Sequence, residues 1–80
     1  MSVDDTVVTV LGEVLRESVG DLLAQPVLAA HDWDSMASLE ALSQLESRLG
    51  VTLDLRAYHG ARTITDLVEL VTAAYTAKTA

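Results

Sequence analysis

The sequence contains no cysteine and no phenylalanine, and it has few positive charges. Without cysteine the chain cannot form a disulfide scaffold or a thiolate metal site, which fits a reducing cytoplasm. Five Lys and Arg stand against twelve Asp and Glu, giving a net charge of −7. This balance argues against nucleic acid as a partner, because contacts to phosphates need Lys and Arg.

Long apolar runs and a basic N-terminus are also missing. No run approaches the ~20 residues that a membrane span needs. The first five residues, read as MSVDD, lack the positive charge that begins a signal peptide. We therefore expect a cytoplasmic protein that does not bind a membrane.

Half of the 80 residues are apolar, which is enough for one small core and leaves little room for a deep catalytic cleft. We expect a single domain over residues 1–80 and, without a surplus apolar face, a monomer. Before Arg48 the only basic residue is Arg16. This acidic part either attracts basic partner surfaces or serves solubility alone.

Apolar residues recur at steps of three and four in three segments, which predicts helices over 3–19, 35–49 and 63–76. We add a short helical turn within 56–61. The connection before the second helix is too apolar for a solvated linker, so we expect a long, ordered loop over the core. The expected fold is an all-α bundle of three to four helices with a long first loop.

Capping residues mark the ends of these helices. Ser2 and Thr63 each precede an Asp at capping-box spacing. Asp34 is a suitable N-cap for the second helix. Gly20 and Gly50 are interpreted as the stops of the first and second helices.

Ser35 directly follows Asp34, at the predicted junction between the long loop and the second helix. Unpaired N–H groups and the positive end of the helix dipole favour a phosphate at such a position. A hydroxyl there is therefore well placed to accept a phosphodiester from a modifying enzyme. Asp34 is either a plain N-cap or a recognition residue that orients a metal-bound donor.

The serine lies within the motif Trp33-Asp34-Ser35-Met36. Four further motifs follow it at fixed distances: Leu39-Glu40, Leu45-Glu46, Gly50-Val51-Thr52-Leu53 and Thr63-Ile64-Thr65-Asp66-Leu67. The set resembles the acyl and peptidyl carrier proteins of the free-standing type, and the match covers the whole chain. One departure is that Asp32 and Trp33 stand where the family often has glycine before the serine.

The resemblance implies a phosphoprotein with a phosphopantetheine arm, taken from coenzyme A, on Ser35. The thiol of the arm would hold acyl, aminoacyl or peptidyl groups as thioesters, and the carrier itself would not be an enzyme. Implied partners are a phosphopantetheinyl transferase and loading and processing enzymes, such as adenylation, acyltransferase, ketosynthase or condensation enzymes. These would read the face around the serine, formed by Met36, Leu39, Glu40, Ser43 and Ser47.

Ser43 and Ser47 make this face less acidic than in fatty-acid carriers. The resemblance therefore points to a polyketide or nonribosomal-peptide pathway of secondary metabolism, such as antibiotic biosynthesis. Met36 is either a core residue or a partner contact. Trp33 either anchors the loop by packing or takes part in recognition. Glu40 is either a solvated charge or a partner contact.

The same residues also allow three other functions to be considered: an interaction module, a metal site and a hydrolase. An unmodified helical protein–protein interaction module would explain the amphipathic helices, but not the motifs in register after Ser35. A metal site at His31, Asp32 and Asp34 lacks the spacing of a known cation loop. A hydrolase using Ser35 and His59 lacks the G-x-S-x-G elbow. We therefore expect neither a metal site nor an enzyme.

Overall fold

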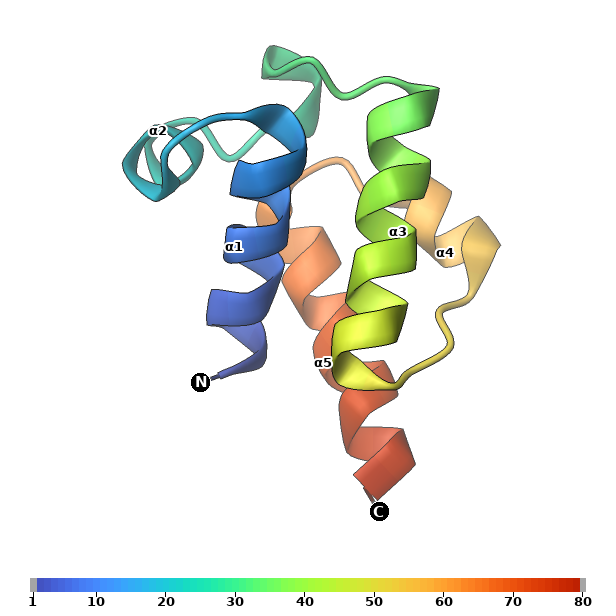
Figure 1. Cartoon of the computed structure of the whole chain (residues 1–80). Helices are drawn as coiled ribbons and strands as arrows, with labels where there is room; N and C mark the ends of the chain where they lie inside the picture. Colours follow the sequence, from blue (N-terminus) through green and yellow to red (C-terminus); the bar gives the residue numbers. More distant parts are fainter. Residues whose placement is uncertain (1, 80) are drawn as a thin grey trace.

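The computed structural model describes residues 2–79 and is all-α, which confirms the predicted fold class. Its α-helices are α1 (Val3–Leu15), α2 (Val19–Ala24), α3 (Ser35–Leu49), α4 (Leu55–Gly60) and α5 (Ile64–Thr79). A single turn of 3-10 helix, Leu28–Ala30, lies in the connection before α3. In Figure 1 the three long helices lie beside one another, and the short α4 lies next to α3, in the segment that connects α3 to α5.

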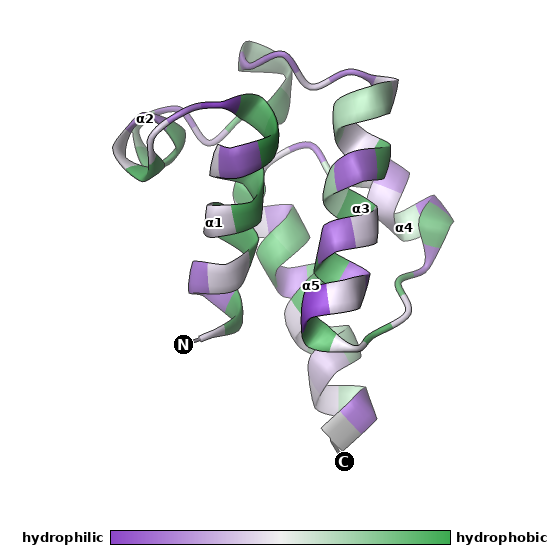
Figure 2. Cartoon of the chain, viewed as in Figure 1, coloured by the Kyte–Doolittle hydropathy of each residue, from purple (hydrophilic) through white to green (hydrophobic). Residues whose placement is uncertain are grey.

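The core lies between α1, α3 and α5, because α1 packs against both other long helices. The predicted apolar stripes supply it, and Figure 2 shows their hydrophobic faces turned inward. Central side chains with 0% exposure are Val7, Val10, Leu11, Leu45, Leu67 and Val71. Burial of each such side chain contributes about 1.5–3 kcal/mol, which offsets the low helix propensity of the valines in α1.

The predicted N-terminal caps are present. The Ser2 hydroxyl accepts a hydrogen bond from the N–H of Asp5 at 3.2 Å. Thr63 and Asp66 form a reciprocal capping box, in which each side-chain oxygen accepts the N–H of the other residue. Gly50 ends α3 in the left-handed conformation, with φ of 63°. At these helix ends, the local capping residues therefore act as the sequence predicts.

The predicted end of the first helix is wrong, because α1 stops at Leu15 rather than at residue 19. Arg16 takes the left-handed conformation with φ of 57°, and the N–H of Glu17 then bonds to the carbonyl of Gly12 at 3.0 Å. A Cβ at Gly12 would lie 3.0 Å from the Glu17 carbonyl oxygen, so glycine permits this close turn. Ser18 then caps α2 through the N–H of Asp21.

Gly20 lies inside α2 and is not the stop of the first helix. The connection that we expected as an ordered loop over the core therefore contains α2 and the 3-10 turn. It is held down by Leu22 and Leu28, which are buried, and by a bridge between Val27 and Thr63.

The remaining differences lie at the ends of the later helices. α4 covers Leu55–Gly60, one residue earlier than the predicted turn. α5 continues to Thr79, beyond the predicted end at residue 76. Within residues 2–79, none of the helices has the length and apolar character required to cross a bilayer.

Candidate functional site

Ser35 is the first residue of α3 and is exposed. The helix begins at the end of the bundle opposite the start of α1 and the end of α5 (Figure 1). Asp34 caps it, since its Oδ1 accepts the N–H of Ala37 at 2.8 Å. Its carbonyl accepts the N–H of Ser38 at 2.9 Å. The N–H groups of Ser35 and Met36 come before any intrahelical acceptor, so this helix start favours an anion.

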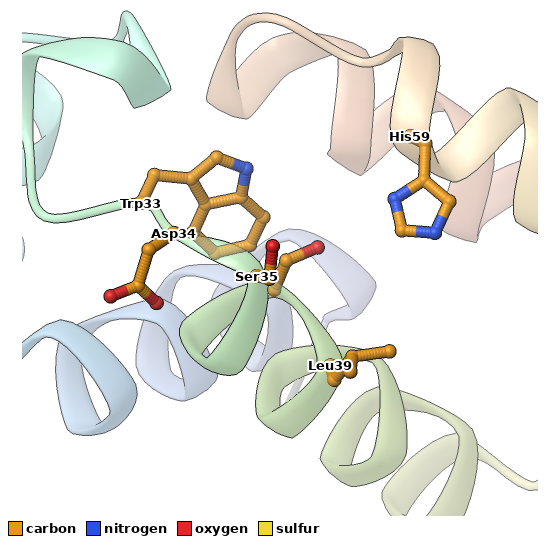
Figure 3. Close-up of a pocket in the computed structure, with 6 residues that line it drawn as sticks. Trp33, Asp34, Ser35, Leu39 and His59 are labelled. Atoms are coloured by element: carbon orange, nitrogen blue, oxygen red, sulfur yellow. The ribbon is translucent and has the colours of Figure 1, made fainter.

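The Ser35 hydroxyl opens into a groove of about 560 Å³ that is lined by Trp33, Asp34, Ser35, Ser38, Leu39 and His59. In Figure 3 the Ser35 side chain stands between the indole of Trp33 and the imidazole of His59. The carboxylate of Asp34 points to the opposite side of the helix start (Figure 3). The groove thus combines the exposed hydroxyl of Ser35 with an imidazole and the apolar side chains of Trp33 and Leu39, whereas Ser38, its second serine, is buried.

The walls of this groove are fixed by contacts to the core. Trp33 is half-buried, and its ring centroid lies 6.4 Å from that of Tyr58. The Tyr58 hydroxyl donates a hydrogen bond of 2.6 Å to the carbonyl of Ser38. Burial raises the pKa of Tyr58 to about 12, so the phenol stays a neutral donor at neutral pH. This bond fixes α4, and His59 with it, against α3.

The predicted partner face lies on the outside of α3. Met36 is 80% exposed and Leu39 is 56% exposed, and Glu40, Ser43 and Ser47 are exposed too. The interpretation of Met36 as a core residue is therefore wrong, whereas its role as a partner contact stays a prediction. Trp33 packs against the core, as the anchor interpretation requires, and its part in recognition is likewise still a prediction.

The sequence alone assigns neither His59 nor Leu55 to the site around Ser35, and it raises His59 only as part of a hydrolase. His59 lines the groove from α4, and Leu55 at the start of α4 leaves an apolar side chain 54% exposed. Neither position carries a local signal, because the packing of α4 against the bundle decides what faces Ser35. Among residues 2–79, no three His, Asp or Glu side chains are grouped so as to hold a metal ion.

Comparisons with known proteins agree with this geometry. Residues 5–71, a span that includes Asp34 and Ser35, match the family model described as "Phosphopantetheine attachment site". The chain is also similar to the D-alanyl carrier protein of Streptococcus suis (strain 98HAH33). The two are 32% identical over 53 residues, which cover 66% of this chain and 67% of the relative.

Proposed function

This chain belongs to the family of proteins with a phosphopantetheine attachment site, and on that premise we propose that Ser35 carries the arm. Members of the family are carrier proteins with covalently attached phosphopantetheine. The observation that carries the proposal is the exposed Ser35 hydroxyl, at the first residue of α3 and open to a groove. Ser38 is the other serine of the groove, but it is buried, so Ser35 is the hydroxyl that a transferase can reach.

The residues around Ser35 fit a phosphodiester. On attachment, a bond forms between Ser35 Oγ and phosphorus, and the P–O bond within the diphosphate of coenzyme A breaks. The adenosine bisphosphate half leaves, and the hydroxyl proton passes to a base of the transferase. The N–H groups of Ser35 and Met36 face the helix start, where the dipole stabilises the added negative charge.

The groove also fits the first part of a flexible arm. Trp33 and Leu39 offer apolar surface beside the hydroxyl, and His59 offers a polar ring from α4. When bound, the arm supplies a thiol that holds cargo as a thioester. Because the groove is open, these residues orient the base of the arm while its thiol remains accessible to enzymes.

Carrier proteins of this family are modified by a phosphopantetheinyl transferase and are served by processing enzymes. We place their docking surface on α3, where Met36 and Leu39 expose apolar side chains and Glu40 adds a negative charge. Such a mixed surface suits a partner with an apolar pocket rimmed by basic residues.

For the cargo, the first candidate is an aminoacyl group loaded by an adenylating enzyme. The similarity to a protein named D-alanyl carrier protein supports this class. An acyl or peptidyl cargo of a polyketide or nonribosomal-peptide pathway is the second candidate, supported by the weakly acidic face at Ser43 and Ser47. Loading of the modified protein with D-alanine, other amino acids and malonyl units by matching enzymes separates them.

The decisive test of the site is intact mass before and after incubation with coenzyme A, Mg²⁺ and a broad-specificity transferase. We expect the wild type to gain one phosphopantetheine and Ser35→Ala to gain none while remaining folded. Thr72→Ala is the control, because Thr72 carries an exposed hydroxyl on α5 outside the predicted partner face, and we expect it to be modified normally. No gain in folded wild type would favour the unmodified interaction module instead.

A further inference from the structure

Both ring nitrogens of His31 face hydrogen-bond acceptors. Nδ1 lies 2.6 Å from Glu17 Oε2, and Nε2 lies 2.8 Å from the carbonyl oxygen of Gln25. The side chain is only 5% exposed, so these contacts are not exchanged freely for water.

The two contacts favour the doubly protonated form of His31. A neutral imidazole carries a single N–H, whereas the imidazolium donates from both nitrogens. The carbonyl of Gln25 only accepts. Between His31 and Glu17 the proton belongs to the ring, because imidazole is a stronger base than carboxylate by about two pKa units in model peptides. This arrangement favours an imidazolium that donates to both acceptors.

The three bridged residues belong to separate parts of the chain. Glu17 follows the left-handed turn that ends α1, and Gln25 is the C-cap of α2. His31 follows the 3-10 turn, and its own carbonyl accepts the N–H of Trp33 at 2.8 Å. The side chain of His31 thus fixes His31, and the carbonyl of His31 in turn holds Trp33, which lies two positions before Ser35. We call these three bridged residues the His31 clasp.

We propose that protonated His31 is a positioning residue for Ser35: the His31 clasp holds the segment that leads into α3, and Ser35 is presented less well once the clasp opens. This role rests on the proposed attachment at Ser35. The clasp itself depends only on the contacts of His31 and can be tested without any modification of the protein.

The direction of the pH dependence follows from the groups around the ring. The Gln25 carbonyl raises the pKa of His31, the carboxylates of Glu17 and Asp21 raise it further, and burial acts against them. The net pKa is above the ordinary value of about 6.5. The clasp is thus closed below that value and opens as pH rises through the elevated pKa. Once neutral, the ring leaves Glu17 or Gln25 without its donor.

The first experiment is a pH titration of the unmodified protein by nitrogen-15 NMR. We expect both His31 nitrogens to be protonated at about pH 6.5 and to titrate above a random-coil histidine. Amide protection factors over residues 31–35, which correct for the base-catalysed rise of intrinsic exchange with pH, should fall about ten- to hundredfold across that titration, the ratio for losing one charge-assisted hydrogen bond. A neutral His31 at about pH 6.5, or amide protection over residues 31–35 that does not change across the His31 titration, would overturn the clasp.

The second experiment measures rates of phosphopantetheine attachment at about pH 6.5 and about pH 8.5. We expect His31→Gln and Glu17→Gln to be several-fold slower than wild type at the lower pH and to approach it at the higher. Glu13→Gln is the matched control, because Glu13 is a carboxylate of α1 that pairs with Arg48 instead. Circular dichroism confirms that each variant is folded.

Equal rates for variant and wild type at both pH values would overturn the positioning role. So would a reduction of equal size at both values, because that result indicates a pH-independent structural defect. If the folded wild type is never modified, the assignment of Ser35 fails, and the NMR titration still decides whether the clasp exists.

Discussion

The hydroxyl of Tyr58 and the main-chain carbonyl of Ser38 form a buried hydrogen bond of 2.6 Å. Tyr58 is 2% exposed and Ser38 is 8% exposed. The bond ties the short helix α4 to the beginning of α3, one turn after Ser35. One side of the groove beside Ser35 therefore depends on a single phenol.

Tyr58→Phe should lower the free energy of unfolding by about 1 kcal/mol, because it removes this hydrogen bond and keeps the ring. The difference should narrow between about pH 10 and about pH 12. In that range the unfolded phenol ionises before the folded one, so the contribution of Tyr58 to stability falls as pH rises. Urea titrations of both proteins check this, and a difference that is zero, or constant with pH, would contradict it.

Arg16 and Gly50 both adopt positive φ at a helix end, at 57° and 63°, but only Gly50 does so without a Cβ penalty. Arg16→Gly should therefore raise the free energy of unfolding by about 0.5–1 kcal/mol. Gly50→Ala should lower it by about 1 kcal/mol for the opposite reason. Thermal unfolding of the two variants gives the signs, and stabilisation by both or by neither would contradict this account of strain.

The difference between these two helix ends also shows what the sequence could and could not predict. Asp34 and Gly50 bracket α3 by local capping chemistry, so its bounds followed from the residues themselves. The end of α1 depends on a close approach of Glu17 to Gly12 and on the competing cap at Ser18. The apolar spacing continues through this break to Val19, which is 46% exposed. Periodicity alone therefore extended the helix too far.

The residues of the candidate site also differ in whether the sequence could predict their roles. Ser35 and Asp34 could be singled out because their role depends on position at a helix start. By contrast, the sequence raised His31 only as a metal ligand, and its partners Glu17 and Gln25 are supplied by the turn after α1 and by α2. Such contacts depend on tertiary structure, which no local pattern specifies.

Asp34 has two interpretations that one pair of variants separates. Asp34→Ala removes the acceptor for the N–H of Ala37 and should cost about 1 kcal/mol of stability, whereas Asp34→Asn keeps a capping oxygen and should cost little. We expect Asp34→Asn to be modified more slowly than wild type, because the charge that orients a metal-bound donor is gone. Modification of Asp34→Asn at the wild-type rate would show that Asp34 is only a cap.

Trp33 is the single tryptophan of the chain and lines the groove beside Ser35, so its fluorescence reports on the arm. We expect attachment of phosphopantetheine to shift the emission and to reduce quenching by acrylamide, because the arm covers the exposed part of the indole. Ser35→Ala, treated in the same way, should show neither change.

The magnitude of this change tests where the arm lies. Trp33 is already packed against the core and near the ring of Tyr58, so attachment acts only on the side of the indole that faces the groove. Leu39→Ala, which removes apolar surface from the same groove, should weaken the protection from acrylamide when it is compared with wild type after intact mass shows complete attachment in both. Unchanged emission in fully modified wild type would mean that the arm leaves Ser35 away from Trp33, and that the groove does not orient it.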